Sequence, residues 1–247
     1  MIVDIKKLTK TFSDGSKKLH VLKDINLQID KGSIITIKGP SGSGKSTLLS
    51  IIGTLDNADS GELLINGISI QDNTNIDKLR NKSIGFVFQF HNLISELTLE
   101  ENVSLPKMIA KEQLDKKELI ELFEYFDLKD RMNSFPNDLS GGEKQGVAFG
   151  RSLYFDSDLI VLDEPTMGLS IQETEKVLNF VKGLKKENKS AIFIDHNIIH
   201  VYGAADRFII LDRGEVVGEF NKEEISREEL VQKMIQLHES GKIKVEA

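Results

Sequence analysis

Residues 39–47 carry the clearest chemical capacity in the sequence, because they read GPSGSGKST. Glycines let the backbone curl until several N–H groups point at one phosphate, and the start of a following helix adds its positive end. Lys45 is placed to reach the β- and γ-phosphates, and the Ser46 hydroxyl suits Mg²⁺. The pattern predicts a phosphate loop, the alternative being a glycine-rich loop with a chance lysine. Its predicted binding residues are Gly39, Pro40, Ser41, Gly42, Ser43, Gly44, Lys45, Ser46 and Thr47.

A second chemical pattern is an apolar run that ends in two carboxylates. Residues 159–164 read LIVLDE, which predicts a buried strand with Asp163 and Glu164 at its carboxyl end, where α/β sheets bind ligands. Successive strand residues point in opposite directions, so the two carboxylates are expected to have different roles. Asp163 is expected near the Mg²⁺ and Glu164 near the water that attacks the γ-phosphate. The alternative is a solvated turn.

Residues 139–143 read LSGGE, and we call them the serine-glycine segment. A serine followed by two glycines at a helix start offers a hydroxyl and backbone N–H groups to an anion. The sequence therefore contains two potential phosphate-binding segments far apart, unless the second is an ordinary helix cap. The residues in question are Ser140, Gly141, Gly142 and Glu143.

The elements that must position these residues are predicted to alternate between strands and helices. Short apolar runs followed by turn or helix signals indicate an α/β fold with a largely parallel sheet. Runs bounded by turn residues such as Asn66-Gly67 predict antiparallel strands, and Asp212-Arg213-Gly214 predicts a hairpin. Strands are expected at 33–38, 159–162 and 191–194, antiparallel strands at 22–29 and 62–70, the hairpin strands at 208–211 and 215–220, and helices over most of 90–153 and after Ser226.

Composition limits the kind of protein this can be. A chain of 247 residues can bury a substantial core, and no repeat or linker divides it. The net charge of −7 argues against a free-standing nucleic-acid-binding protein, so no nucleic-acid partner is expected. The absence of cysteine excludes disulfides and thiolate metal sites. No apolar run approaches the ~20 residues that span a bilayer, and the first ten residues do not resemble a signal peptide.

The order and spacing of these motifs over residues 1–220 resemble the ATP-binding cassette (ABC) ATPases. The resemblance implies an α/β P-loop NTPase (RecA-like) core with a mixed, mainly parallel sheet, an antiparallel β subdomain and an inserted helical subdomain. The expected division of this single ABC ATPase domain is a core at 1–89 and 154–220, a helical subdomain at 90–153 and a helical tail at 221–247.

The same resemblance implies the ligands and further site residues. ATP and Mg²⁺ would be bound by a head-to-tail homodimer, in which the serine-glycine segment of one chain closes on the phosphate loop of the other. Gln89 matches a glutamine that senses Mg²⁺ and the attacking water, with a plain polar strand end as the alternative. His196 matches a histidine that contacts the γ-phosphate, although a lone histidine is usually structural. Phe12 matches an aromatic residue that stacks on adenine, or it packs within the protein.

Two positions depart from the family pattern. Gly146 stands where the family often has arginine, and with Gly150 it weakens a predicted helix by roughly 1 kcal/mol per glycine. That helix is expected to be looser, or packed unusually close to a neighbour. Ser170 stands where the family typically has aspartate, which puts a contact across the dimer in doubt, although Ser170 and Glu173 can still cap the next helix.

Two parts of the chain resemble different branches of the family. Residues 79–105 resemble the lipoprotein-releasing, macrolide-export and cell-division ATPases, whereas residues 194–220 resemble those of sugar importers. We favour an ATP-hydrolysing subunit of an exporter-type or lipoprotein-release transport system, with integral membrane permease subunits as partners. The alternatives are an importer ATPase, a non-transport ABC ATPase and a nucleotide-gated regulator. The expected location is cytoplasmic, at the inner face of the membrane.

Overall fold

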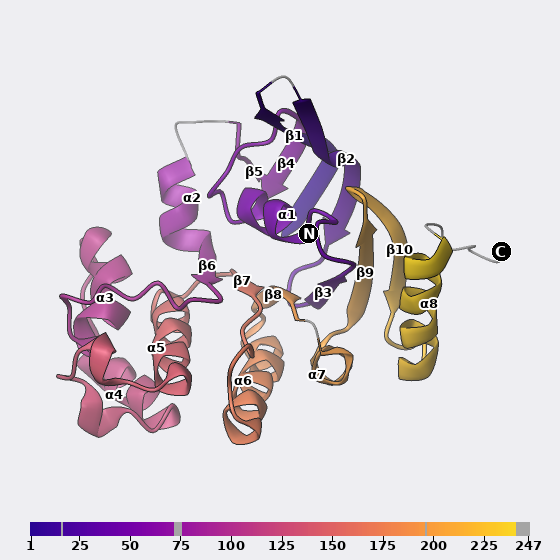
Figure 1. Cartoon of the computed structure of the whole chain (residues 1–247). Coiled ribbons are helices and arrows are strands. Elements are labelled where there is room, and N and C mark those ends of the chain that lie inside the picture. The colour runs from indigo at the N-terminus through magenta and orange to yellow at the C-terminus, as the bar shows by residue number, and fades with distance from the viewer. Residues whose placement is uncertain (16, 72–75, 196, 241–247) are drawn as a thin grey trace.

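The main sheet contains six strands in the order β10-β9-β3-β8-β7-β6, and it is parallel except for β10 (Figure 1). The computed structural model describes residues 1–15, 17–71, 76–195 and 197–240. The strands are β3 (Ile34–Lys38), β6 (Ile84–Val87), β7 (Leu159–Asp163), β8 (Ser190–Ile194), β9 (Arg207–Asp212) and β10 (Glu215–Asn221). The predicted α/β class and the mixed, mainly parallel sheet are confirmed.

The central strands are apolar throughout because both faces of the sheet are covered. Alternate residues of one strand enter two different core clusters: Ile35 and Ile37 belong to the first, and Ile34 belongs to the second. The same alternation occurs along β7, where Leu159 and Val161 share the first cluster. Since successive side chains of a strand point to opposite faces, a doubly covered strand requires a continuous apolar run.

A second, antiparallel sheet lies over the first core cluster. Its four strands, in the order β2-β1-β4-β5, pair through registers such as Val3↔Ile29 and Val3↔Ile65. The turn between β4 and β5 is formed at Asn66-Gly67, as predicted, with positive φ at both residues. The strands are β1 (Val3–Asp14), β2 (Lys17–Ile29), β4 (Ser60–Ile65) and β5 (Ile68–Ser69).

The helices cover both faces of the main sheet and form a separate group beyond β6 (Figure 1). Helix α1 packs under the antiparallel sheet, whereas α6 and α7 pack on the opposite face, with α8 beside α7. Helices α3, α4 and α5 lie together in the group beyond β6. The helices are α1 (Lys45–Ile52), α2 (Ile76–Ser83), α3 (Leu99–Ile109), α4 (Lys116–Tyr125), α5 (Gly141–Tyr154), α6 (Ile171–Leu184), α7 (Ile198–Ala204) and α8 (Arg227–Ser240), with short 3-10 turns η1 (Lys129–Arg131), η2 (Pro136–Asp138) and η3 (Lys185–Glu187).

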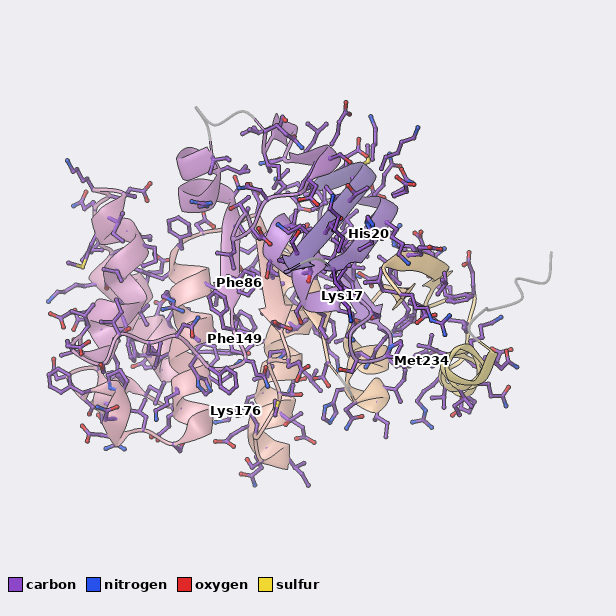
Figure 2. The ribbon with its side chains drawn as sticks, turned by 45° about the horizontal axis from the view of Figure 1, so that its top comes forward. Lys17, His20, Phe86, Phe149, Lys176 and Met234 are labelled. Carbon is purple, nitrogen blue, oxygen red and sulfur yellow. The ribbon has the colours of Figure 1, made fainter. Side chains whose placement is uncertain are left out.

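The group α3–α5 has a small core of its own. Buried residues from all three helices, including Val103, Phe123 and Val147, form a third cluster, while Phe149 of α5 joins the second. Helix α5 also contacts β6, and Figure 2 labels Phe149 on α5 and Phe86 on β6, where Phe86 packs against the first cluster. Helix α5 therefore connects the helical group to the sheet. The residue numbers at which we divide the domain remain a prediction.

Side chains cap the starts of two helices in the regions where helices were expected. Asp115 caps α4 by accepting hydrogen bonds from the backbone N–H groups of Lys117 and Glu118. Ser226 and Glu229 form a reciprocal cap before α8. Among the described residues, no helix is both long enough and apolar enough to cross a membrane.

Candidate active site

The phosphate loop, residues 39–47, connects β3 to α1 and requires glycine at two tight positions. Gly39 has φ 150°, and a Cβ there would overlap the backbone oxygen of Leu211 and lie 2.9 Å from Ser43 Oγ. Gly44 has φ 102°, and a Cβ there would lie 2.8 Å from the backbone oxygen of Val21. Strands β2 and β9 therefore press against the loop, and only glycine lets it pass between them.

The start of α1 leaves backbone donors available. Its N-cap is Gly44, which has no side chain to accept a hydrogen bond from the first turn. The first N–H groups of a helix lack partners within the helix and carry the positive end of its dipole. The exposed Ser46 lies in this first turn. An anion placed before α1 would satisfy these donors.

Lys45 lies folded over the phosphate loop. Its Nζ donates hydrogen bonds to the backbone oxygens of Gly39 at 2.9 Å and Pro40 at 2.8 Å. Burial lowers the pKa of the Lys45 ammonium, whereas the nearby carboxylates of Glu164 and Asp163 raise it. The loop lysine and the acidic strand end, 118 positions apart in sequence, are thus brought together as predicted.

Glu164 adopts a backbone conformation that is uncommon for its residue type. Its φ is 50°, in the left-handed region, and the residue follows directly after the last residue of β7, Asp163. The backbone N–H of Glu164 donates to the oxygen of Ile194 at 2.9 Å, and Met167 N–H donates to the Glu164 oxygen at 3.2 Å. Such conformations cost of order 1–3 kcal/mol and persist where the surroundings enforce them, often at functional sites.

Gln89 approaches the same turn from the neighbouring strand. It follows β6, which pairs in parallel with β7, and its Nε2 lies 2.7 Å from the sulfur of Met167. Met167 belongs to the turn that Glu164 begins. The structure therefore places Gln89 beside the turn that carries the predicted general base.

A buried lysine that we did not predict also lies in this site. Lys38, the last residue of β3, is only 3% exposed, and its Nζ donates to the backbone oxygen of Asp195. The pKa of Lys38 is lowered to about 8, chiefly by burial and to a smaller extent by the Lys45 charge, while the Asp195 and Glu164 charges oppose the shift. The available sequence signal was a charged residue at the end of an apolar run, directly before the phosphate loop.

The serine-glycine segment forms the start of α5. Ser140 Oγ accepts from Glu143 N–H at 3.2 Å, and Glu143 Oε2 accepts from Ser140 N–H at 2.7 Å. The backbone hydrogen bond from Ser140 lowers the pKa of the Glu143 carboxyl. A Cβ at Gly142 would overlap the Glu173 carboxylate of α6, so this glycine permits a close approach, whereas Gly141 has open space around it.

The structure explains the unusual glycine at position 146. A Cβ at Gly146 would lie 3.3 Å from both Leu128 Cδ1 and Phe126 Cβ, a tight approach. A Cβ at Gly150 would meet only Val103, at 3.6 Å and 4.0 Å, which is ordinary contact. Helix α5 is therefore packed closely against the segment after α4 at Gly146, the second of the two outcomes that we considered.

Ser170, the other departure, begins α6. Its Oγ accepts from Glu173 N–H at 3.3 Å, and Glu173 Oε2 accepts from Ser170 N–H at 2.8 Å. The predicted capping box is thus confirmed, and Ser170 replaces one function of an aspartate at a helix start.

Two predicted residues stand apart from this cluster. Phe12, on β1, is 43% exposed, and Lys10 Nζ lies 5.0 Å from the centre of its ring. One face of the ring is therefore engaged by a cation, and the exposed remainder can accept a flat group. His196 lies outside the described residues.

Comparisons with known proteins agree with this geometry. A family model described as ABC transporter matches residues 22–167. A macrolide export ATP-binding/permease protein of Aggregatibacter actinomycetemcomitans is 38% identical over 230 residues, which cover 91% of this chain and 35% of that protein. A lipoprotein-releasing system ATP-binding protein of Treponema denticola is 42% identical over 202 residues, or 79% of this chain and 89% of that one.

A solved structure agrees in fold as well as sequence. It is a dimeric, post-hydrolysis state of the ATP-binding cassette MJ0796 of Methanocaldococcus jannaschii, bound to ADP and Pi. The TM-score is 0.83 and the identity 37%, over 89% of this chain and 98% of that one. The present chain spans about a third of the macrolide export protein and nearly all of the two shorter relatives. Since the family model matches more than half of the residues and the shorter relatives are covered almost in full, the chain belongs to the ABC transporter family.

Proposed function

We propose that this chain binds Mg-ATP and hydrolyses it, and that it works in pairs to energise a membrane transport partner. The observation that carries the proposal is the juxtaposition of Lys45, at an uncapped helix start, with Asp163 and Glu164 at the end of β7. A triphosphate at the start of α1 would receive the N–H groups of the loop and exchange the Lys45 bonds to Gly39 and Pro40 for bonds to phosphate oxygens.

Mg²⁺ fits the residues beside that position. In the described part of the chain no three histidine or carboxylate side chains gather to hold a metal unaided. A hydroxyl from Ser46, a carboxylate from Asp163 and the amide oxygen of Gln89 are oxygen donors of the kind that Mg²⁺ uses together with substrate phosphates. When bound, the ion neutralises charge on the phosphate oxygens.

The hydrolytic step would use Glu164 as general base. Its carboxylate accepts a proton from water while the water oxygen forms a bond to the γ-phosphorus, and the bond between that phosphorus and the β–γ bridging oxygen breaks. The products are ADP and phosphate. Lys45 stabilises the charge that develops on the transferring group, and Gln89 orients the water.

Pairing accounts for the serine-glycine segment. This segment lies in the group α3–α5, which Figure 1 shows beyond β6 and away from α1. In the dimeric relative, ADP and Pi are bound in a paired cassette. We infer that Ser140, Gly141 and Gly142 of one subunit close on ATP held by the phosphate loop of the other, with Phe12 stacking on adenine.

Phosphate release in the presence of Mg-ATP tests the enzymatic part. We expect steady turnover by the wild type and a loss of about a hundredfold or more in Glu164→Gln, with ATP binding retained. Because ATP would remain trapped between subunits, Glu164→Gln with ATP should elute as a dimer in size exclusion. Equal rates for the two proteins would favour the nucleotide-gated regulator, and a monomer with bound ATP would refute the pairing.

A groove beside β6 is the best position for a membrane partner. It has a volume of about 280 Å³ and lies between β6, α3 and α5, with Arg80, Phe86, Leu105, Ile109 and Arg151 among its lining residues. Of these lining residues, Ile109 is 63% exposed. Arg80 and Arg151 donate to backbone oxygens of this chain, so the apolar lining is what suits a helix end of a permease.

The partner is tested by co-purification from detergent. We expect an integral membrane permease to accompany the wild type and to be lost from Ile109→Glu, whereas Leu19→Glu on β2 should retain it; Leu19 is 65% exposed and remote from the groove. Similarity to macrolide-export and lipoprotein-releasing proteins favours a partner of that kind, and attachment to it would place the chain at the inner face of the membrane. An importer permease in the purified complex would establish the alternative branch.

A further inference from the structure

Asp195 connects three segments of the active site. Its backbone oxygen accepts from Lys38 Nζ, its Oδ2 accepts from Thr166 Oγ1, and its Oδ1 accepts from Asn197 N–H at 2.7 Å. Lys38 ends the strand before the phosphate loop, Thr166 lies two residues after Glu164, and Asn197 caps α7. Asp195 is 4% exposed, so these hydrogen bonds are shielded from water.

The arrangement follows from the sheet. Strands β3 and β8 are parallel neighbours, and the pair Thr36↔Phe193, continued by two residues, sets Lys38 opposite Asp195. An unpaired ammonium is costly to bury, so a lysine only 3% exposed requires a partner such as the one it has. Lys38 is therefore held in one position rather than free to reorient.

The same hydrogen bonds hold the turn that carries Glu164. The carbonyl of Ile194 accepts from Glu164 N–H, the next carbonyl along the chain accepts from Lys38, and the Asp195 carboxylate accepts from Thr166. The left-handed backbone of Glu164 needs such support to persist. The connection runs from Lys38 through Asp195 and Thr166 to the residues around Glu164.

We propose that Lys38 is a positioning residue for hydrolysis, which acts through Asp195 and Thr166 to set the Glu164 carboxylate relative to the phosphate loop. This assignment rests on the ATPase function proposed above. Lys45 remains the lysine that touches phosphate, so the loss of Lys38 affects the rate of the bound complex more than its formation. A purely structural buried pair would instead alter stability without acting through Glu164.

Steady-state hydrolysis separates the two roles. We expect Lys38→Met to lower kcat by roughly ten- to a hundredfold while KM changes by less than about threefold, because misplacement of a general base by about 1 Å costs on that scale. Thr166→Val, which removes only the hydroxyl, should act in the same direction. Thr166→Ser keeps the hydroxyl and should recover most of kcat. Thermal unfolding of each variant establishes that it is folded.

The decisive measurement is single-turnover hydrolysis of γ-labelled ATP in the Glu164→Gln background. If Lys38 and Thr166 act through Glu164, adding Lys38→Met or Thr166→Val there should change the residual rate by less than about twofold. An equal loss in both backgrounds would overturn the assignment, as would an unchanged kcat in Thr166→Val. If Lys38→Met does not fold, Thr166→Val and Thr166→Ser still test the proposal. Absence of turnover by the wild type would refute the ATPase function itself, a result distinct from these.

Discussion

The phosphate loop and the serine-glycine segment both present a helix start to solvent, but they are built differently. The first is braced by its own chain: β2 and β9 press on Gly44 and Gly39, and the first turn of α1 has no side-chain cap. The second already satisfies part of its first turn through Ser140 and Glu143, and a Cβ at Gly141 would have nothing within 4 Å. This difference supports the proposal that the first segment receives an anion by itself, whereas the second supplements a site formed elsewhere.

The strongest way to break this comparison is Ser140→Arg. If the serine-glycine segment serves only ATP held by a partner, a bulky cation there should reduce hydrolysis by about a hundredfold or more and change the Kd for ATP by less than about threefold. Phosphate release and ATP titration measure the two effects. Thr98→Ala removes the matched capping box from α3 and controls for the loss of a helix cap, about 1 kcal/mol. Loss of ATP binding in Ser140→Arg would contradict the division of roles.

The next test concerns the bracing of the phosphate loop. Gly39→Ala would drive a Cβ into the carbonyl of Leu211, at φ 150°, so we expect a loss of about 3 kcal/mol or more in unfolding free energy together with loss of ATP binding. Gly42→Ala is the matched control: φ is 75°, but nothing lies within 4 Å of its Cβ, so only about 1 kcal/mol of backbone strain is expected. Denaturant unfolding compares them. Equal losses would show that crowding by β9 does not shape the loop.

The sequence predicted the features that are encoded locally. The phosphate loop, the apolar strand that ends at Asp163 and the cap formed by Ser170 and Glu173 each depend on residues close together in the chain. What it did not reveal depends on contacts between distant positions. Lys38 meets Asp195 across 157 positions, and no periodicity reports which strands become neighbours.

The glycines of α5 show the same limit. At the sequence level, Gly146 is a poor helix residue, and only the approach of Phe126 and Leu128 decides between a loose helix and a tightly packed one. The Glu173 carboxylate similarly proved to serve twice, as a cap for α6 and as the neighbour of Gly142. Tertiary packing, which local patterns do not contain, set these details.

The pH dependence of the unfolding free energy tests whether Lys38, at the end of the strand before the phosphate loop, is desolvated. Its folded pKa is about 8 against an ordinary 10.5, so the unfolded chain binds more protons between these values and stability rises with pH there. The difference in unfolding free energy, wild type minus Lys38→Met, should be flat below pH 8 and rise by roughly 2–3 kcal/mol by pH 10. Denaturant titrations across that range measure it.

The charged groups around Lys38 set the control for this measurement. Asp195, Glu164 and Lys45 act on its charge, and His200 Nδ1 lies 3.9 Å from the Asp195 carboxylate. All four are shared by the wild type and Lys38→Met, so the difference isolates the lysine. Lys38→Met also removes the donor to the Asp195 carbonyl, which lowers stability by a pH-independent amount. A flat difference would mean that Lys38 keeps an ordinary pKa, and a difference that falls with pH would mean a raised pKa; either result would show that burial does not set the pKa of this lysine.

The smallest expected effect concerns Gly146 and Gly150 of α5, the helix that begins at the serine-glycine segment. Alanine is favoured over glycine in a helix by about 1 kcal/mol, so Gly150→Ala, with only ordinary contacts to Val103, should stabilise the protein by up to that amount. At Gly146 the same gain is offset because Leu128 and Phe126 must shift by a few tenths of an ångström. We therefore expect Gly146→Ala to be neutral or destabilising, about 1 kcal/mol below Gly150→Ala in denaturant unfolding. Equal stabilisation would mean that the segment after α4 yields easily, and that a looser α5 was the correct expectation.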